Sequence, residues 1–370
     1  MKRVLSIVLM IALSVALLVG CSSTETPVEE PVQTPTPDTG AETPATDEGT
    51  ITKLGLGHIV SIAKSKDKGV DANGNPVNAT AQADVMIAAV GFDADGKVVS
   101  VSIDTAQTRV AFDENMQVTS DVNAEVPTKR DLGADYGMVK ASGIGKEWFE
   151  QMDALQEWMI GKTVDEILSM ETTMRDEAHP SVPNVPELTS SVTIDVGDYL
   201  RAIEEAWNNS IDVNGAEKVG LGIKTSIAKS VSAGTDANGN PVTAKAQVDT
   251  MISAVALDAE GKVVGSIIDT AQVVIPFDEE GKVAIDKTAE LRTKNELKED
   301  YGMGKVSPIG KEWYEQAQAL AEWMKGKSLD EIKAMKLEEG RPAEEDLVSS
   351  VTIHVNEYLV VVEEAINNAK

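Results

Sequence analysis

Cysteine is almost absent from this chain: Cys21 is the only one in 370 residues. A single thiol excludes a disulfide framework, a haem attached through two cysteines and an iron–sulfur cluster held by cysteines. Histidine is nearly as scarce, because only His58, His179 and His354 occur. Basic side chains are also few, with 33 Lys and Arg against 61 Asp and Glu and a net charge of −28. So acidic a chain excludes nucleic acid as a partner and is otherwise typical of a solvated surface.

Most of the sequence after residue 50 occurs in two copies that are offset by 165 residues. Asp104 matches Asp269, for example, and residues 144–167 share 17 of 24 positions with residues 309–332. A repeat of this length predicts a duplicated domain and not a short structural period.

The three histidines do not follow the repeat. His58 matches Ile223, His354 matches Asp195, and His179 lies in a stretch that the second copy lacks. A Ser-His-Asp or zinc site present in both copies is therefore not expected, and no metal site or catalytic residue is predicted. A hydrolase whose site lies in one copy alone stays open as an alternative.

The first 21 residues predict a secretory leader and a lipid anchor. Lys2 and Arg3 precede an apolar run that is too short for a membrane span and that leads into Cys21. Residues 18–21, Leu-Val-Gly-Cys, resemble a bacterial lipobox, whose cysteine is lipidated and becomes the first residue of the mature protein. An ordinary signal peptide with an incidental cysteine is the alternative.

Residues 22–50 are rich in Pro, Thr and Glu and contain almost no large apolar side chains. Such a segment cannot bury enough surface to fold, so it predicts a disordered tether that holds the folded part away from a lipid surface. Removal of the leader takes Lys2 and Arg3 and no acid, which leaves 31 basic and 61 acidic side chains and a net charge of −30.

The remaining sequence is long enough for two domains of similar build, over residues 51–210 and 214–370. Turn signals between alternating stretches predict antiparallel strands, including hairpins at 85–103 and 251–268. Apolar residues at helical spacing predict a helix at 146–159, its repeat, and a second helix at the end of each copy. This pattern predicts an α+β class, with helices packed on an antiparallel sheet in each of two tandem homologous domains.

Two patterns that suggest chemistry have simpler explanations. The paired carboxylates Asp165 and Glu166 would suit a glycosidase. However, Thr163 before them predicts a helix start with Glu166 as its capping partner. Gly55 and Gly57 only weakly resemble a phosphate-binding loop, because no Walker lysine or dinucleotide motif accompanies them.

The strongest chemical signal lies near the end of the second copy. The sequence there reads Asp346, Leu347, Val348, Ser349, Ser350, Val351 and Thr352. It resembles the flavinylation signal of FMN-binding domains, in which an acidic residue, two variable positions, a Ser or Thr and two small residues precede an acceptor Thr or Ser. In that family a flavin transferase moves FMN from FAD onto the hydroxyl as a phosphodiester. The resemblance implies that Thr352 carries FMN and that Asp346, Ser349 and Ser350 belong to the signal.

The first copy offers a related heptapeptide, Glu187, Leu188, Thr189, Ser190, Ser191, Val192 and Thr193. By the same resemblance Thr193 carries a second FMN, with Glu187, Ser190 and Ser191 in the signal. Glu187 departs from the family's Asp at the first position.

Each acceptor precedes a predicted helix. A helix that starts beside the threonine would aim unpaired backbone N–H groups and the positive end of its dipole at the attached phosphate. The alternative is an ordinary helix cap, formed by these hydroxyls or by Asp195 or Asn356.

The segments 135–138 and 144–148, with their second copies, are similar to the tandem-FMN surface lipoproteins of Gram-positive extracellular electron transfer, and this resemblance covers essentially the whole mature chain. A flavin ring needs apolar or aromatic cover and a few polar contacts. Tyr136 and Tyr301 are the candidate neighbours of the ring. Tryptophans at helical spacing are more typical of a core.

The resemblance implies an electron carrier and not an enzyme, lipid-anchored on the outer face of the cytoplasmic membrane. It would take electrons from a membrane quinol-linked donor and pass them to extracellular acceptors, with two covalent FMN groups on mobile domains. The alternative function is a cell-surface binding lipoprotein with two unmodified ligand-binding repeats that gain avidity.

Overall fold

Each half of the chain forms an antiparallel sheet. The computed structural model describes residues 49–370, so the predicted leader, Cys21 and nearly all of the tether lie outside the described residues. The first sheet has the order β5-β4-β1-β8 and the second the order β13-β12-β9. Their strands are β1 (Ile51–Ser61), β4 (Thr80–Phe92), β5 (Val98–Ala111), β8 (Ile211–Ala216), β9 (Lys218–Ser226), β12 (Lys245–Leu257) and β13 (Val263–Pro276). The predicted α+β class with antiparallel sheets is confirmed.

The helices follow the same order in both halves. Those of the first half are α1 (Lys129–Leu132), α2 (Trp148–Met159), α3 (Val164–Leu168) and α4 (Gly197–Asn208). Those of the second half are α5 (Lys294–Leu297), α6 (Trp313–Met324), α7 (Leu329–Lys333) and α8 (Asn356–Asn367). No helix within residues 49–370 combines the length and apolar character that crossing a bilayer requires.

Short elements fill the connections between these helices and strands. Four are 3₁₀ turns: η1 (Gly133–Tyr136), η2 (Met138–Lys140), η3 (Lys298–Tyr301) and η4 (Met303–Lys305). The others are two-residue ribbons: β2 (Gly69–Val70) with β3 (Pro76–Val77), β6 (Thr172–Thr173) with β7 (Val182–Pro183), β10 (Gly234–Thr235) with β11 (Pro241–Val242), and β14 (Leu337–Glu338) with β15 (Arg341–Pro342).

The paired carboxylates lie in the first turn of α3, where Glu166 serves the helix start as predicted. Thr163 is the N-cap residue, and its backbone N–H donates to Oε2 of Glu166 at 2.8 Å. Hydrogen bonds from Thr163 also hold the pKa of Glu166 below its ordinary value. The capping interaction therefore accounts for Glu166 without a catalytic role.

Helices α4 and α8 pack on the strands where only glycine leaves room. A Cβ added at Gly57 in β1 would lie 1.9 Å from the carbonyl oxygen of Ala202 in α4. One added at Gly222 in β9 would lie 2.0 Å from the carbonyl oxygen of Val361 in α8. Both distances are far below van der Waals contact. These glycines are packing positions, and the weak resemblance to a phosphate-binding loop was wrong.

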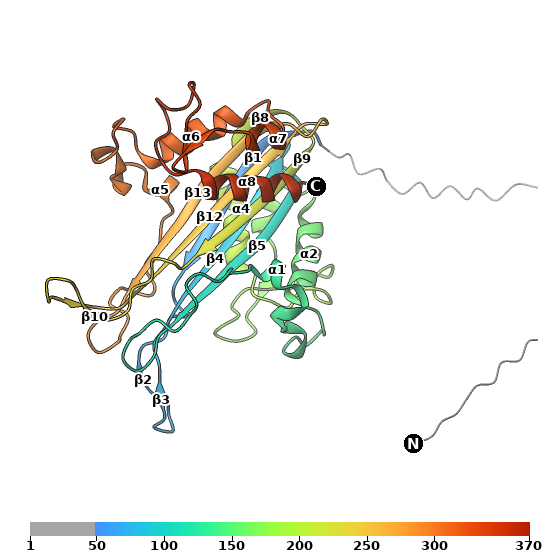
Figure 1. The fold of residues 1–370 in the computed structure, drawn as a ribbon. Coiled ribbons are helices and arrows are strands. Elements are labelled where there is room, and N and C mark those ends of the chain that lie inside the picture. The colour runs from blue at the N-terminus through green and yellow to red at the C-terminus, as the bar shows by residue number, and fades with distance from the viewer. Residues whose placement is uncertain (1–48) are drawn as a thin grey trace, which may run out of the picture. The chain divides into compact units, whose positions relative to one another are not determined.

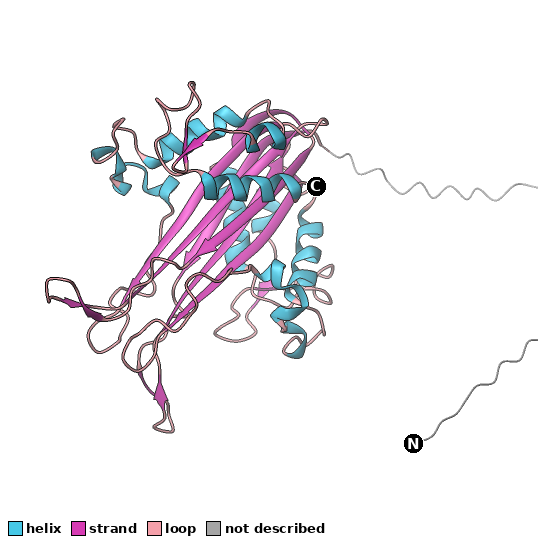
Figure 2. Ribbon diagram, viewed as in Figure 1, coloured by secondary structure: helices cyan, strands magenta, loops and turns pink. Residues whose placement is uncertain are grey.

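The two sheets bury their other faces against each other, and the helices lie outside (Figures 1 and 2). One shared cluster brings together Ile87 of β4 and Ile252 of β12. A second places Phe112 and Phe277 edge to face, with ring centroids 5.0 Å apart. Because helices cover one face and the opposite sheet covers the other, β4 and β12 are buried along nearly their whole length. The layers run helices, sheet, sheet, helices.

The chain passes between the halves through β8, which starts inside the domain boundary predicted at residues 210–214. This strand pairs antiparallel with β1 and so extends the first sheet. Directly after it, Glu217 donates its backbone N–H to the carbonyl oxygen of Leu257 in the second sheet at 2.8 Å. The described residues all belong to one compact unit. The shared core therefore holds the halves together.

Replacement of Gly57 by alanine is expected to lower the free energy of unfolding by roughly 3 kcal/mol or more, since α4 must move off β1 to admit the methyl group. Urea unfolding followed by circular dichroism measures this loss. Gly69→Ala is the control, because no atom lies within 4 Å of the Cβ it adds, and it is expected to change stability by less than about 0.5 kcal/mol. Equal stabilities for the two variants would contradict the packing described.

Candidate functional site

The heptapeptide that ends in Thr352 is a turn anchored by its apolar residues. Leu347 and Val351 are buried in the core, and the Val351 backbone N–H donates to the Leu347 carbonyl at 2.9 Å. Asp346 and Ser349 are exposed. The first half repeats this arrangement, with buried Leu188 and Val192 and with exposed Glu187 and Ser190. Ser191 and Ser350 are half-buried. Each motif thus presents its acidic residue and first serine to solvent.

Thr352 is held by a buried glutamine of α6. Its backbone N–H donates to Oε1 of Gln316 at 2.8 Å, and its hydroxyl donates to the same oxygen at 3.2 Å. The glutamine Nε2 donates in turn to Oγ of Ser307 at 3.3 Å and to the Lys311 carbonyl at 3.1 Å. Because the amide of Gln316 is bonded at both ends, it fixes the position of the threonine hydroxyl.

Thr193 is held in the same way in the first half. Its backbone N–H and hydroxyl donate to Oε1 of Gln151 in α2 at 2.9 and 3.3 Å. Nε2 of Gln151 donates to Ser142 at 3.3 Å and to the Lys146 carbonyl at 3.2 Å. The two halves therefore build one arrangement twice, although their motifs differ at the first position.

Neither threonine caps a helix, so the part of the cap alternative that uses the threonine hydroxyls is wrong. Helices α4 and α8 begin at Gly197 and Asn356, each four positions beyond the threonine, and their N-cap residues are Val196 and Val355. Asp195 accepts from the Gly197 backbone N–H at 3.1 Å, which leaves the threonine free of that task. The same spacing contradicts the expectation that the helix starts beside the threonine and aims its dipole at an attached group.

A pocket of about 340 Å³ opens beside Thr352. Its lining includes Lys294, Met303, Trp313, Arg341, His354 and Tyr358. Aromatic and thioether groups thus meet cationic or potentially cationic ones next to the hydroxyl. Ligand pockets combine apolar walls with a few polar groups in this way.

Lys294 connects this pocket to Tyr301, one of the two tyrosines predicted from the sequence. Its Nζ lies 5.0 Å from the ring centroid of Tyr301 and 5.1 Å from that of Trp313, both within cation–π range. Burial lowers the pKa of Lys294 to about 8, although the carboxylate of Asp249 opposes the shift. Tyr301 therefore contacts Lys294, which lines the pocket, but does not line the pocket itself.

The first half contains the same group of side chains. Lys129 lies 5.2 Å from the ring centroid of Tyr136 and 5.3 Å from that of Trp148, and burial lowers its pKa to about 8. Arg175 donates from Nη1 to the carbonyl oxygen of Thr193 at 2.8 Å. Each half therefore places an arginine close to its threonine, Arg175 here and Arg341 in the second half.

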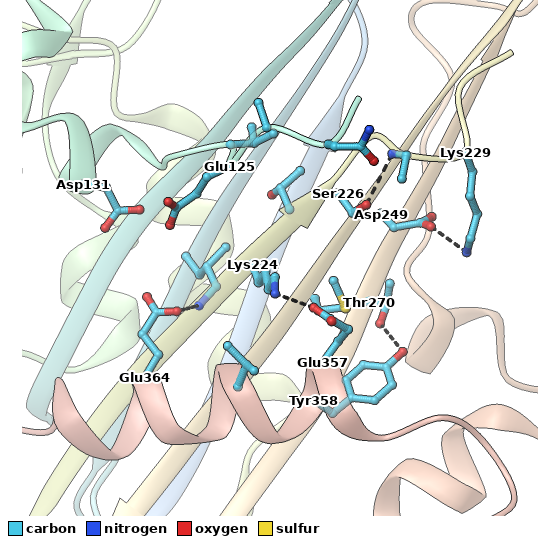
Figure 3. A pocket seen from close by; sticks show the side chains of 18 of the residues that line it. Glu125, Asp131, Lys224, Ser226, Lys229, Asp249, Thr270, Glu357, Tyr358 and Glu364 are labelled. Carbon is cyan, nitrogen blue, oxygen red and sulfur yellow. Dashed lines mark hydrogen bonds and ion pairs between the residues drawn. The ribbon is translucent and has the colours of Figure 1, made fainter. Parts of the chain in front are cut away.

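A larger cavity of about 910 Å³ lies between the halves and shares Lys294 and Tyr358 with the Thr352 pocket. Figure 3 shows Lys229 paired with Asp249 at 2.9 Å and the hydroxyl of Tyr358 bonded to that of Thr270 at 3.0 Å. Lys294 and Tyr358 therefore lie between the Thr352 pocket and this larger cavity.

The far end of this cavity is acidic. Glu125 and Asp131 of the first half lie on the same side as Glu364 of α8 (Figure 3). Burial raises the pKa of Glu364 to about 7, and the charges of the two first-half carboxylates add to the shift. The cationic end, at Lys229 and Lys294, is the better match for an anionic ligand.

Sequence reasoning found the two threonines but missed the side chains that surround them. Gln151 matches Gln316 and Lys129 matches Lys294, both identical at the offset of 165. Identity of a polar residue in both copies was the available signal. The two arginines do not share this offset, because the connection that carries them differs in length between the copies.

No family model, curated protein or solved structure matches the chain.

Proposed function

We propose that this chain is an extracytoplasmic electron-transfer flavoprotein that carries FMN as a phosphodiester on Thr352 and on Thr193. In this proposal a flavin transferase attaches both groups. The protein then takes electrons from a membrane quinol-linked donor and passes them to extracellular acceptors, while lipid on Cys21 anchors it to the outer face of the membrane. The two halves are tandem homologous FMN-binding domains.

One observation carries the proposal: each half holds the acceptor threonine of a flavinylation-like signal against a fully buried glutamine. Both copies keep this arrangement although their motifs differ at the first position, Glu187 in one and Asp346 in the other. The exposed acidic residue and first serine of each motif suit recognition by a separate enzyme. The buried leucine and valine suit a motif that keeps its shape during modification.

The surroundings fit the charge and the ring of FMN. Arg341 and His354 beside Thr352, and Arg175 beside Thr193, would neutralise a phosphate. Trp313 and Tyr358 offer aromatic cover in the pocket next to Thr352. When bound, FMN would supply reversible electron transfer, and a covalent link would prevent its loss outside the cell.

Co-expression with a flavin transferase is expected to add two FMN groups, each transferred from FAD to a threonine hydroxyl with release of AMP, so that each increases the mass by that of FMN less one water. Intact-mass spectrometry of the wild type, Thr193→Ala, Thr352→Ala and the double variant should give two, one, one and no additions. Thr352→Ser is the matched control and should retain the second addition, because serine keeps the hydroxyl. If the Thr352→Ala variant still carried two FMN groups, the assignment of Thr352 would be refuted.

The same samples test the alternative function. Colourless, unmodified wild-type protein that binds wall polymers or peptides would favour the cell-surface binding lipoprotein with two unmodified repeats. A yellow protein whose flavin absorbance disappears in the double variant would favour the electron carrier.

Replacement of Lys294 by methionine is expected to make the midpoint potential of the flavin on Thr352 more negative. A nearby cation favours the reduced, more anionic flavin, and methionine removes that charge while keeping an unbranched side chain. Because the pKa of Lys294 is about 8, the lysine is charged below that pH, and the difference from wild type should shrink as the pH rises beyond it.

Redox titration of the Thr193→Ala background isolates the second flavin for this measurement. Lys262→Met, a change of an exposed lysine at the turn between β12 and β13, serves as the control and should leave the potential unchanged. Equal midpoint potentials for Lys294→Met and wild type at pH 7 would show that the charge of Lys294 does not act on the flavin.

A further inference from the structure

A second cluster of ionisable side chains, made of residues other than those that hold the two threonines, lies where the two halves meet. His58 of β1 and Glu205 of α4 belong to the first half, and Asp269 of β13 and Glu296 of α5 belong to the second. His58 is only 5% exposed. Ligand atoms of His58, Glu205 and Glu296 all lie within 4.8 Å of one another.

The two ring nitrogens of His58 have different surroundings. Nε2 lies 3.0 Å from Oδ2 of Asp269 in a hydrogen bond. Because a carboxylate only accepts, this bond places a proton on Nε2. Nδ1 has no hydrogen-bond partner although it is buried. It lies 2.9 Å from Oε1 of Glu205 and 3.9 Å from Oε2 of Glu296. Nδ1 is therefore the ring nitrogen that lies close to both glutamates.

Asp269 is fixed in the role of orienting the ring. Its Oδ1 accepts from the backbone N–H groups of Thr270 at 2.6 Å and Asn295 at 3.1 Å. Its Oδ2 accepts from the hydroxyl of Thr293 at 2.7 Å as well as from His58. A carboxylate that accepts from one nitrogen of an imidazole while the other nitrogen is left for a cation is the usual outer partner of a metal-binding histidine.

The negative charge of the carboxylates in this cluster favours a bound cation. The carboxylates of Glu205, Asp269 and Glu296 together carry −3, and among the described residues His58 holds the only basic nitrogen within 4.0 Å of any of them. A proton on Nδ1 would leave −2, whereas a divalent ion bound by neutral His58 would leave −1. Uncompensated carboxylates in a partly buried site are costly.

We propose that His58 Nδ1, Glu205 and Glu296 bind a divalent transition-metal ion, with Zn²⁺ as the best match, and that Asp269 orients the histidine. Imidazole and carboxylate donors suit Zn²⁺. Ligands at about 2.1 Å in a tetrahedron lie roughly 3.4 Å apart, and the separations of 2.9 and 3.9 Å from Nδ1 lie on either side of that value. The side chains of Glu205 and Glu296 are 19% and 31% exposed, which leaves a route for the ion and room for a water ligand.

The inference does not depend on the proposed flavin function, and among residues 49–370 the site occurs only once. The corresponding place across the interface has Ile223 in place of His58 and Glu364 in place of Glu205. The metal would join an element of each half, because its ligands come from β1 and α4 on one side and from α5 on the other. Its binding should therefore stabilise the pairing of the halves. No metal was predicted from the sequence because a metal-binding histidine was expected in both copies, and His58 has Ile223 as its match.

The test is Zn²⁺ binding to the purified chain after removal of metals with a chelator. Competition with a chromophoric chelator and elemental analysis should show one tightly bound Zn²⁺ per chain. At about a hundredfold excess of free Zn²⁺ over Kd, Tm should rise by roughly 4–5 °C. His58→Ile, which copies the residue at 223, should weaken binding at least ~100-fold, beyond what loss of an outer-shell partner causes.

The Glu296→Gln variant distinguishes loss of metal binding from a folding defect. The Oε2 atom of Glu296 accepts from the Thr293 backbone N–H at 2.7 Å in the capping box of α5, and glutamine can make the same bond. This variant should keep its Tm without metal yet bind Zn²⁺ at least ~10-fold more weakly. Asp131→Asn, at the matching position of α1, is the control and should bind as tightly as wild type. Wild-type protein without stoichiometric Zn²⁺, or Glu296→Gln with unchanged affinity, would overturn the site.

Discussion

The burial of two apolar sheet faces against each other is the constraint on which the rest of this structure depends. Each sheet receives cover on its outer face from the helices of its own half, but its inner face finds cover only on the other half. A separated half would expose residues such as Ile87 or Ile252, which are completely buried here. The duplication thus supplies each half with the missing layer of its core. The halves are two parts of one folding unit.

The sequence predicts those parts of the fold that depend on residues close together in the chain, and it predicts less well those that depend on residues far apart. Strands, hairpins, helices and the cap at Thr163 depend on local patterns, and these predictions are confirmed. The pairing of sheets depends on contacts far apart in the chain. A hint was present in residues 85–90, where apolar side chains follow one another without polar alternation. Such a run indicates cover on both faces, whereas one sheet with helices on one side needs cover on only one.

The candidate sites also differ in whether their residues are close together in the sequence. Thr193 and Thr352 stand in short motifs, so they were visible, and Gln151 and Gln316 were recoverable from their identity in both copies. His58 gave no such signal, because its partner Asp269 lies 211 residues away and its own match is Ile223. Comparison of the copies therefore hides a site that draws its residues from both and occurs once.

Rigid pairing also changes how a relay with two flavins would work. Thr193 is held by α2 on the outer side of the first sheet, and Thr352 by α6 on the outer side of the second. Two sheets that pack about 10 Å apart lie between them, with a helical layer on each side. Neither flavin could swing toward the other. Each would meet partners on its own side, and the predicted tether would bring one side or the other to the membrane by moving the whole unit. An interface strengthened by a metal ion would suit this arrangement, since it keeps the two faces at a constant separation.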